Sequence, residues 1–390
     1  MKKLYLVMQE FKQGKGSYSR VFQDIAQYFT NYGYETTILA PQFKNQQKKE
    51  IEEYAKIIRF SILKFPIFSN VIISILFAFH MILFFNKNKL NDMDVIIANG
   101  DAALGLPKGK FILRLPDQPA KTYLKSMELA KESSFLTSVG RFIHIKLINI
   151  LEIYYIKKAK AVISASNISR QDFVKQYSIK GGPYFIPHAG IDLKKFKKKH
   201  TTKRKEKTLL FISSYKERIR KGLPLLEKTL PKVFKKYKNV KLIHLGEKFE
   251  WNIPERYKKN IISIGKVSNQ EVQKYYASSD IFLSCSIHEM IPNTLLEAMA
   301  SGLPVLFSDI IGIHEYIQHK KSGYIFQRGN SEELYQGITF LLENPKLRKK
   351  MAGNARKKVA KLDKRVYYKR LYNFIQQTYQ GKKDSVNLLE

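Results

Sequence analysis

The chain has 390 residues, enough for two or three domains, and its 44% hydrophobic content excludes a chain that is disordered throughout. The single cysteine, Cys285, excludes an internal disulfide framework and a four-cysteine zinc site. A net charge of +36 indicates anionic partners, either nucleic acid, anionic lipid head groups or phosphorylated substrates, although part of the excess can reflect a skewed codon composition.

In the first half, strand-like apolar runs alternate with helical runs. A strand predicted at 3–9 is followed by a helix at 17–33, whose apolar face is Val21, Ile25, Phe29 and Tyr32. Further strands are predicted at 34–41, 94–100, 109–117, 159–166 and 183–190. This alternation predicts a parallel sheet covered by helices. The apolar run at the start is too short for a signal peptide, and no cleavage site follows it.

The stretch from Ile67 to Phe85 is almost entirely apolar. Its length is at the lower limit of the roughly 17–25 residues that span a bilayer. Three interpretations stay open: a buried helix, a helix lying in the membrane interface between flanking lysines, or a spanning helix.

The alternation stops at 192–207, where nine Lys and Arg face two acids, and this segment is predicted to be an exposed linker that buries nothing. It restarts with strands predicted at 208–214, 240–246, 260–267, 280–286, 303–309 and 322–326. We therefore predict an α/β protein with an N-terminal Rossmann-like domain at 1–192, a linker at 193–207 and a second Rossmann-like domain at 208–365. A final helix at 366–390 is predicted to return to the first domain. Ligands bind at the carboxyl ends of parallel strands, so the cleft between two such domains is the expected site.

Two glutamates, Glu289 and Glu297, flank the start of a helix that is predicted to begin at Thr294, after the strand at 280–286. One interpretation is purely structural: Thr294 and Glu297 have the spacing of a capping box. The other is chemical, because free amides at a helix start attract phosphate and carboxylates accept hydrogen bonds from sugar hydroxyls. The second interpretation predicts a nucleotide-sugar site.

Two further stretches have residues suited to a phosphorylated ligand. Lys216 and Lys221 lie in the basic turn after the strand at 208–214, where they can neutralise a departing pyrophosphate, although a solvated basic turn has the same pattern. Gly14 and Gly16 follow the first strand, where glycines permit close approach of a ligand.

The stretch "EMIPNTLLEAMASGLPV" resembles the E-x7-E signature of retaining family 4 glycosyltransferases, which have the GT-B fold. The segments "SYKERIRKG", "FIPHAGIDLKKF" and "SGYIFQRGNSEELYQGITFLLENP" resemble other parts of the same family, most closely from about 160 to 360. The resemblance implies two Rossmann-like domains facing across a cleft, with a C-terminal helix crossing back.

The resemblance also implies roles for individual residues. Glu289, Lys221 and Lys216 would act in catalysis, and Glu297 would bind the ribose of the nucleotide. The donor would further contact Met290, Ile291, Pro292, Asn293, Thr294, Leu295, Lys216, Lys221 and Gly16. The acceptor side would include Gly14, Gly16, Arg114 and Asp117. No metal and no cofactor are implied, since basic side chains and helix ends would neutralise the diphosphate.

Some positions depart from the family pattern. Pro116 stands where a histidine is usual, so Arg114, Asp117 or a residue elsewhere would substitute for it, and Lys216 replaces the usual arginine. Met290 and His188 stand where glycine and asparagine are common.

The sequence therefore predicts a retaining glycosyltransferase, with a hexose as the expected sugar. It would transfer the sugar from a nucleotide-diphosphate donor to a lipid-linked or cell-envelope saccharide, as in polysaccharide biosynthesis. We expect it in the cytoplasm, peripheral on the inner face of an anionic membrane. Two alternatives stay open: a basic nucleic-acid-binding protein, which the absence of a known binding module disfavours, and an inactive glycosyltransferase-like partner subunit.

Overall fold

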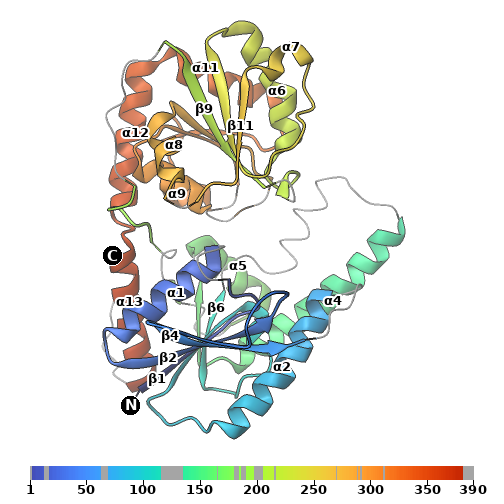
Figure 1. Cartoon of the computed structure of the whole chain (residues 1–390), viewed down its shortest axis with the longest axis vertical. Helices are drawn as coiled ribbons and strands as arrows, with labels where there is room; N and C mark the ends of the chain where they lie inside the picture. Colours follow the sequence, from blue (N-terminus) through green and yellow to red (C-terminus); the bar gives the residue numbers. More distant parts are fainter. Residues whose placement is uncertain are drawn as a thin grey trace. The chain divides into compact units, whose positions relative to one another are not determined.

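The protein is described by a computed structural model that covers residues 2–12, 17–62, 69–115, 135–164, 166–179, 184–185, 190–196, 205–214, 217–268, 270–287, 289, 292–310 and 312–380. The chain divides into two units, one formed by Met1–Ala189 with Arg365–Glu390 and the other by Gly190–Lys364. Each unit has a sheet with helices packed against it, so the predicted α/β class is confirmed (Figure 1).

Within its described residues, the first unit has a sheet of eight strands in the order β3-β4-β2-β1-β5-β6-β7-β8. All neighbours are parallel except β3 and β4, which form an antiparallel edge that the sequence did not predict. The strands are β1 (Lys2–Val7), β2 (Tyr34–Gln42), β3 (Lys49–Glu52), β4 (Ala55–Ser61), β5 (Val95–Asn99), β6 (Phe111–Leu115), β7 (Ala161–Ser164) and β8 (Tyr184–Phe185).

Helices cover both faces of this sheet, because alternate residues of a strand point to opposite faces. Leu4 and Leu6 of β1 lie in the cluster shared with α1 (Ser17–Thr30) and α13 (Lys364–Gln380). Tyr5 and Val7 lie in the other cluster, with α2 (Ser69–Lys87), η1 (Gly100–Ala103), α4 (Phe135–Lys158) and α5 (Asn167–Tyr177). The predicted apolar face of α1 was wrong at one position, since Tyr32 lies beyond the helix end and is 47% exposed.

α2 is the predicted apolar helix, and it is half-buried. Phe77, Met81 and Phe85 pack into the core beneath it. Within the described parts of the chain, no helix is both long and apolar enough to cross a bilayer.

The second unit has, among the residues described, a fully parallel sheet of six strands in the order β11-β10-β9-β12-β13-β14. The strands are β9 (Lys207–Ile212), β10 (Val240–Leu245), β11 (Ile261–Gly265), β12 (Ile281–Ser284), β13 (Val305–Ser308) and β14 (Tyr324–Phe326). The helices are α6 (Leu223–Lys236), α7 (Glu255–Lys258), α8 (Val272–Ser278), α9 (Asn293–Ala300), α10 (Ile313–Tyr316), α11 (Ser331–Glu343) and α12 (Pro345–Ala360).

The start of the second unit corrects the prediction of an exposed basic linker. Phe196 is 6% exposed and packs in the core of this unit against Tyr276. Asp192 forms an ion pair with Lys364, 3.0 Å from its Nζ. Phe196 therefore holds this lysine-rich segment against the core. The linker prediction considered the lysines and overlooked this aromatic side chain. Residues 197–204 lie outside the described part.

Candidate functional site

The turn between β9 and α6 is fixed by a glycine. Gly222 has φ +72, and a Cβ atom there would lie 1.9 Å from the carbonyl oxygen of Cys285, so a side chain does not fit. The Ile287 amide donates to the Arg220 carbonyl at 2.8 Å. The loop after β12 is thereby held against the turn that carries Arg220 and Lys221.

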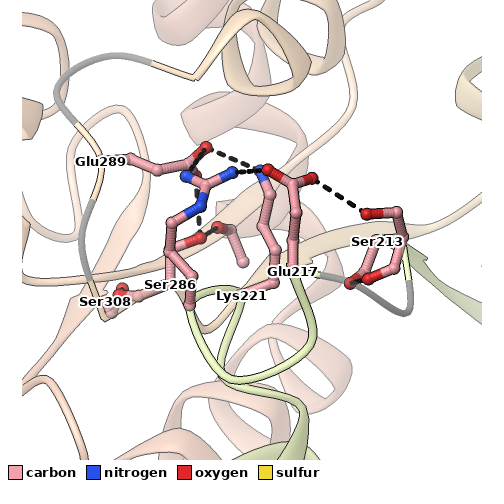
Figure 2. Close-up of polar contacts among 9 residues, drawn as sticks. Ser213, Glu217, Lys221, Ser286, Glu289 and Ser308 are labelled. Atoms are coloured by element: carbon pink, nitrogen blue, oxygen red, sulfur yellow. Dashed lines mark hydrogen bonds and ion pairs between the residues drawn. The ribbon is translucent and has the colours of Figure 1, made fainter. Parts of the chain in front are cut away.

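These two loops bring a carboxylate and two cations together (Figure 2). Lys221 Nζ lies 2.6 Å from Glu289 Oε1, and Arg220 Nη1 lies 3.1 Å from the same oxygen. The Lys221 and Glu289 side chains are only 12% and 11% exposed. Arg220 also pairs with Glu217, whose other oxygen accepts from Ser214.

The charges around Glu289 set its protonation. Burial by itself would raise the pKa of Glu289, but the nearby Lys221 and Arg220, with hydrogen bonds from Lys221 and Ser286, bring it below the ordinary value of 4.5. Burial would lower the pKa of Arg220, and Glu289 and Glu217 outweigh that effect and raise it. Glu289 is therefore an anion held by two cations at neutral pH.

Three serines complete the network beneath Glu289 (Figure 2). Ser286 Oγ donates to Glu289 Oε2 at 2.8 Å and lies 3.2 Å from Ser284 Oγ. Ser308 Oγ, at the end of β13, donates to the Ser286 carbonyl at 2.6 Å. Sequence analysis missed Ser286 and Ser308, although both stand where a predicted strand ends.

The second glutamate of the signature is held inside the unit. Glu297 is 8% exposed and accepts from Tyr276 OH at 2.9 Å. The capping-box interpretation is wrong, because α9 begins at Asn293 with Pro292 at its N-cap and has no side-chain cap. The Leu295 amide donates to the Pro292 carbonyl at 3.0 Å, so it is not the free amide that we predicted there.

The remaining predicted site residues divide into two groups. Arg114, in β6 of the first unit, is 4% exposed and donates to Asn99 Oδ1 at 3.1 Å. Lys216, Met290, Ile291, Gly14, Gly16, Asp117, Pro116 and His188 lie outside the described residues. No group of three His, Cys, Asp or Glu side chains that could hold a metal is found among the residues that are described. Cys285 is buried, and burial raises the pKa of its thiol.

A second polar cluster, also missed by sequence analysis, lies at the carboxyl ends of β1 and β5. Asp101 accepts from Ser74 Oγ at 2.5 Å, and Gln9 Nε2 donates to the same hydroxyl at 3.0 Å. Burial raises the pKa of Asp101 despite these hydrogen bonds. This is the end of the sheet at which ligands of parallel α/β proteins bind.

Comparison with known proteins finds a family match within the second unit. Residues 192–358 match the family described as "Glycosyl transferases group 1". An uncharacterized glycosyltransferase of Haemophilus influenzae is 32% identical over 168 residues, which are 41% of this chain and 46% of that protein. The chain thus spans less than half the length of this curated relative.

Solved structures match over nearly the whole chain. Sucrose-phosphate synthase from Thermosynechococcus elongatus has a TM-score of 0.77 at 14% identity, covering 98% of this chain and 100% of that one. Anabaena HepE in complex with UDP-glucose has a TM-score of 0.66 at 14% identity, covering 97% and 100%. At such identity these structures establish the fold alone. Residues 192–358 therefore match the glycosyltransferase group 1 family model, and the chain has the GT-B fold.

Proposed function

We propose that the protein is a retaining glycosyltransferase that takes a sugar, expected to be a hexose, from a nucleotide-diphosphate donor. The observation that carries the proposal is the buried contact of Glu289 with Lys221 and Arg220, at the carboxyl ends of β9 and β12. The matched family and the UDP-glucose held by HepE, a protein of the same fold, support a nucleotide-sugar as the donor.

The chemistry follows from these charges. A departing diphosphate develops negative charge, and Lys221, with Lys216 and the start of α9, would stabilise it without a metal. Glu289, as an acceptor, would orient hydroxyls of the donor sugar, and Glu297 would accept from the ribose. The diphosphate then competes with Glu289 for Lys221, so donor binding exchanges one anionic partner of this lysine for another.

The acceptor is proposed to be membrane-associated, because two helices of the first unit expose apolar stripes. Residues of each stripe recur at helical spacing and are 42–61% exposed. They are Ile75, Phe79, Ile82 and Leu83 of α2 and Leu147, Ile150 and Tyr154 of α4. Lysines accompany both stripes, which suits the interface of an anionic membrane on the cytoplasmic side.

The donor part is tested by nucleotide binding followed by turnover. Nucleoside diphosphates and their sugars are screened by thermal shift, since a ligand at a hundred times its dissociation constant adds about 2.7 kcal/mol of stability. Turnover of the best donor is then measured for Glu289→Gln and Lys221→Ala, and we expect a loss of at least about a hundredfold in each.

The matched control is Lys232→Ala, which removes a lysine of α6 whose partner is the exposed Glu332. It should retain normal turnover. Equal activity in Glu289→Gln and the wild type would refute the site assignment. Nucleotide binding without turnover of any donor would instead favour the inactive partner subunit.

A further inference from the structure

A pocket of about 510 Å³ opens on the first unit, between the end of α2, the segment after η1 and the end of α4. Its apolar wall includes Phe85, Leu90 and Leu106. Three lysines, Lys89, Lys110 and Lys158, also line it.

The pocket lies at the end of the sheet opposite to the polar cluster of Asp101. Lys110 directly precedes β6, Lys158 ends α4 shortly before β7, and Leu90 precedes β5. These are the amino ends of parallel strands, whereas substrates of such sheets bind at the carboxyl ends. The proposed sugar transfer therefore does not account for this pocket.

The lysines leave positive charge available to a ligand. Among the described residues Lys89 makes no ion pair, and Lys110 pairs only with Asp92, at 3.3 Å and with that carboxylate 99% exposed. Such an exposed pair contributes less than about 1 kcal/mol, so a stronger anion can displace it. Lys158 Nζ lies over the Tyr154 ring, 4.8 Å from its centroid.

The apolar wall continues onto the surface of α2. Ile82 lines the pocket, is 48% exposed and belongs to the apolar stripe of that helix. Tyr154, whose ring lies beneath the Lys158 ammonium group, belongs to the apolar stripe of α4. A ligand that uses both surfaces needs an anionic head and an apolar tail, which a free phosphate lacks.

We propose that this pocket binds the phosphate head group of an anionic membrane lipid, with its acyl chains along the stripes of α2 and α4. The lipid would hold the first unit on the membrane at a site separate from the one that handles donor and acceptor. Binding of the lipid is measured without any sugar transfer, so its failure and a failure of the proposed function are distinguishable.

Two matched pairs of charge reversals in the full-length protein test the proposal. Lys89→Glu and Lys158→Glu change the pocket, while Lys87→Glu and Lys157→Glu place the same charge on exposed neighbours that do not line it. The probes are monomeric dihexanoyl phosphatidylglycerol and inorganic phosphate, measured by calorimetry. Phosphatidylcholine vesicles with and without phosphatidylglycerol are measured by sedimentation.

Each pocket variant should weaken binding of the short-chain lipid by about tenfold or more, as expected for loss of a charged hydrogen bond. Each control should stay within about twofold of the wild type, although it loses some vesicle binding through the general attraction of roughly 1 kcal/mol per lysine. Circular dichroism verifies that all four variants fold. Equal losses within both pairs, or inorganic phosphate binding as tightly as the lipid, would overturn the proposal.

Discussion

The contact between Lys221 and Glu289 should be one of strong energetic coupling. We predict the outcome of a double-mutant cycle with Lys221→Met and Glu289→Gln, which keep the size of each side chain and remove its charge. Each single variant leaves the other charge buried, since the two side chains are 12% and 11% exposed. The double variant should therefore destabilise the second unit by less than the sum of the two single variants.

The magnitude follows from the distance. At 2.6 Å and an effective dielectric constant of about 20, two unit charges attract by about 6 kcal/mol. Desolvation of both groups offsets part of this attraction, and Arg220 continues to neutralise Glu289 when Lys221 is lost. We expect a coupling free energy of about 3 kcal/mol.

The assay is urea unfolding followed by tryptophan fluorescence. Trp251 is the single tryptophan of the chain and lies buried in the core of the second unit, so its signal reports that unit. The control cycle uses Lys232 and Glu332, which are 2.9 Å apart but 57% and 54% exposed. Its expected coupling is about 0.2–1 kcal/mol.

A coupling at Lys221 and Glu289 no larger than that of the exposed control pair would refute this reasoning. It would mean that burial does not strengthen the contact and that water reaches Glu289 freely. The proposed competition between Glu289 and a diphosphate would then lose its energetic basis.

Three further predictions concern the same unit. The pKa of Glu289 is depressed in the folded protein, so its ionised form stabilises the fold above the ordinary value of 4.5, and this stabilisation is lost as the pH falls through the lower folded pKa. The difference in free energy of unfolding between the wild type and Glu289→Gln should therefore be constant from neutral pH to about pH 5 and shrink only below that. Gly222→Ala should lower the free energy of unfolding, measured in urea, by at least about 2 kcal/mol. Gly353→Ala, in α12 with open space around it, should raise that free energy by about 0.5–1 kcal/mol. Tyr276→Phe should cost about 2 kcal/mol by removing the hydrogen bond to the buried Glu297, and an unchanged midpoint would show that this bond contributes nothing.

Much of the second unit could be predicted from its sequence, because its strands are continuous apolar runs. β9, β12 and β13 lie within the predicted ranges to within one residue, and each is buried. Runs of this kind are typical of parallel strands covered on both faces. The positions of Lys221 and Glu289 after two such strands followed directly, since the carboxyl ends of neighbouring parallel strands meet.

The antiparallel edge of the first sheet could not be predicted in the same way. β3 is the short segment KEIE, in which apolar and charged residues do not form a buried face, and Ile51 is 87% exposed. It is a strand because β4 pairs with it, from Lys49 opposite Ile58 to Glu52 opposite Ala55. Pairing between segments is a tertiary interaction, and a short polar edge strand leaves little trace in local pattern.

The polar contacts around Glu289 show the limit of inference from a motif. The signature places Glu289 and Glu297 by their spacing, but Ser308 reaches the loop after β12 only because β13 pairs with β12, with Ser284 opposite Phe307. A shift of that register by one residue would turn Ser308 to the other face of the sheet. Register depends on the packing of the whole sheet and not on the residues near the glutamates. Lys221 and Glu289 could thus be named from sequence, whereas the second cation, Arg220, and the serines that orient the carboxylate required the structure.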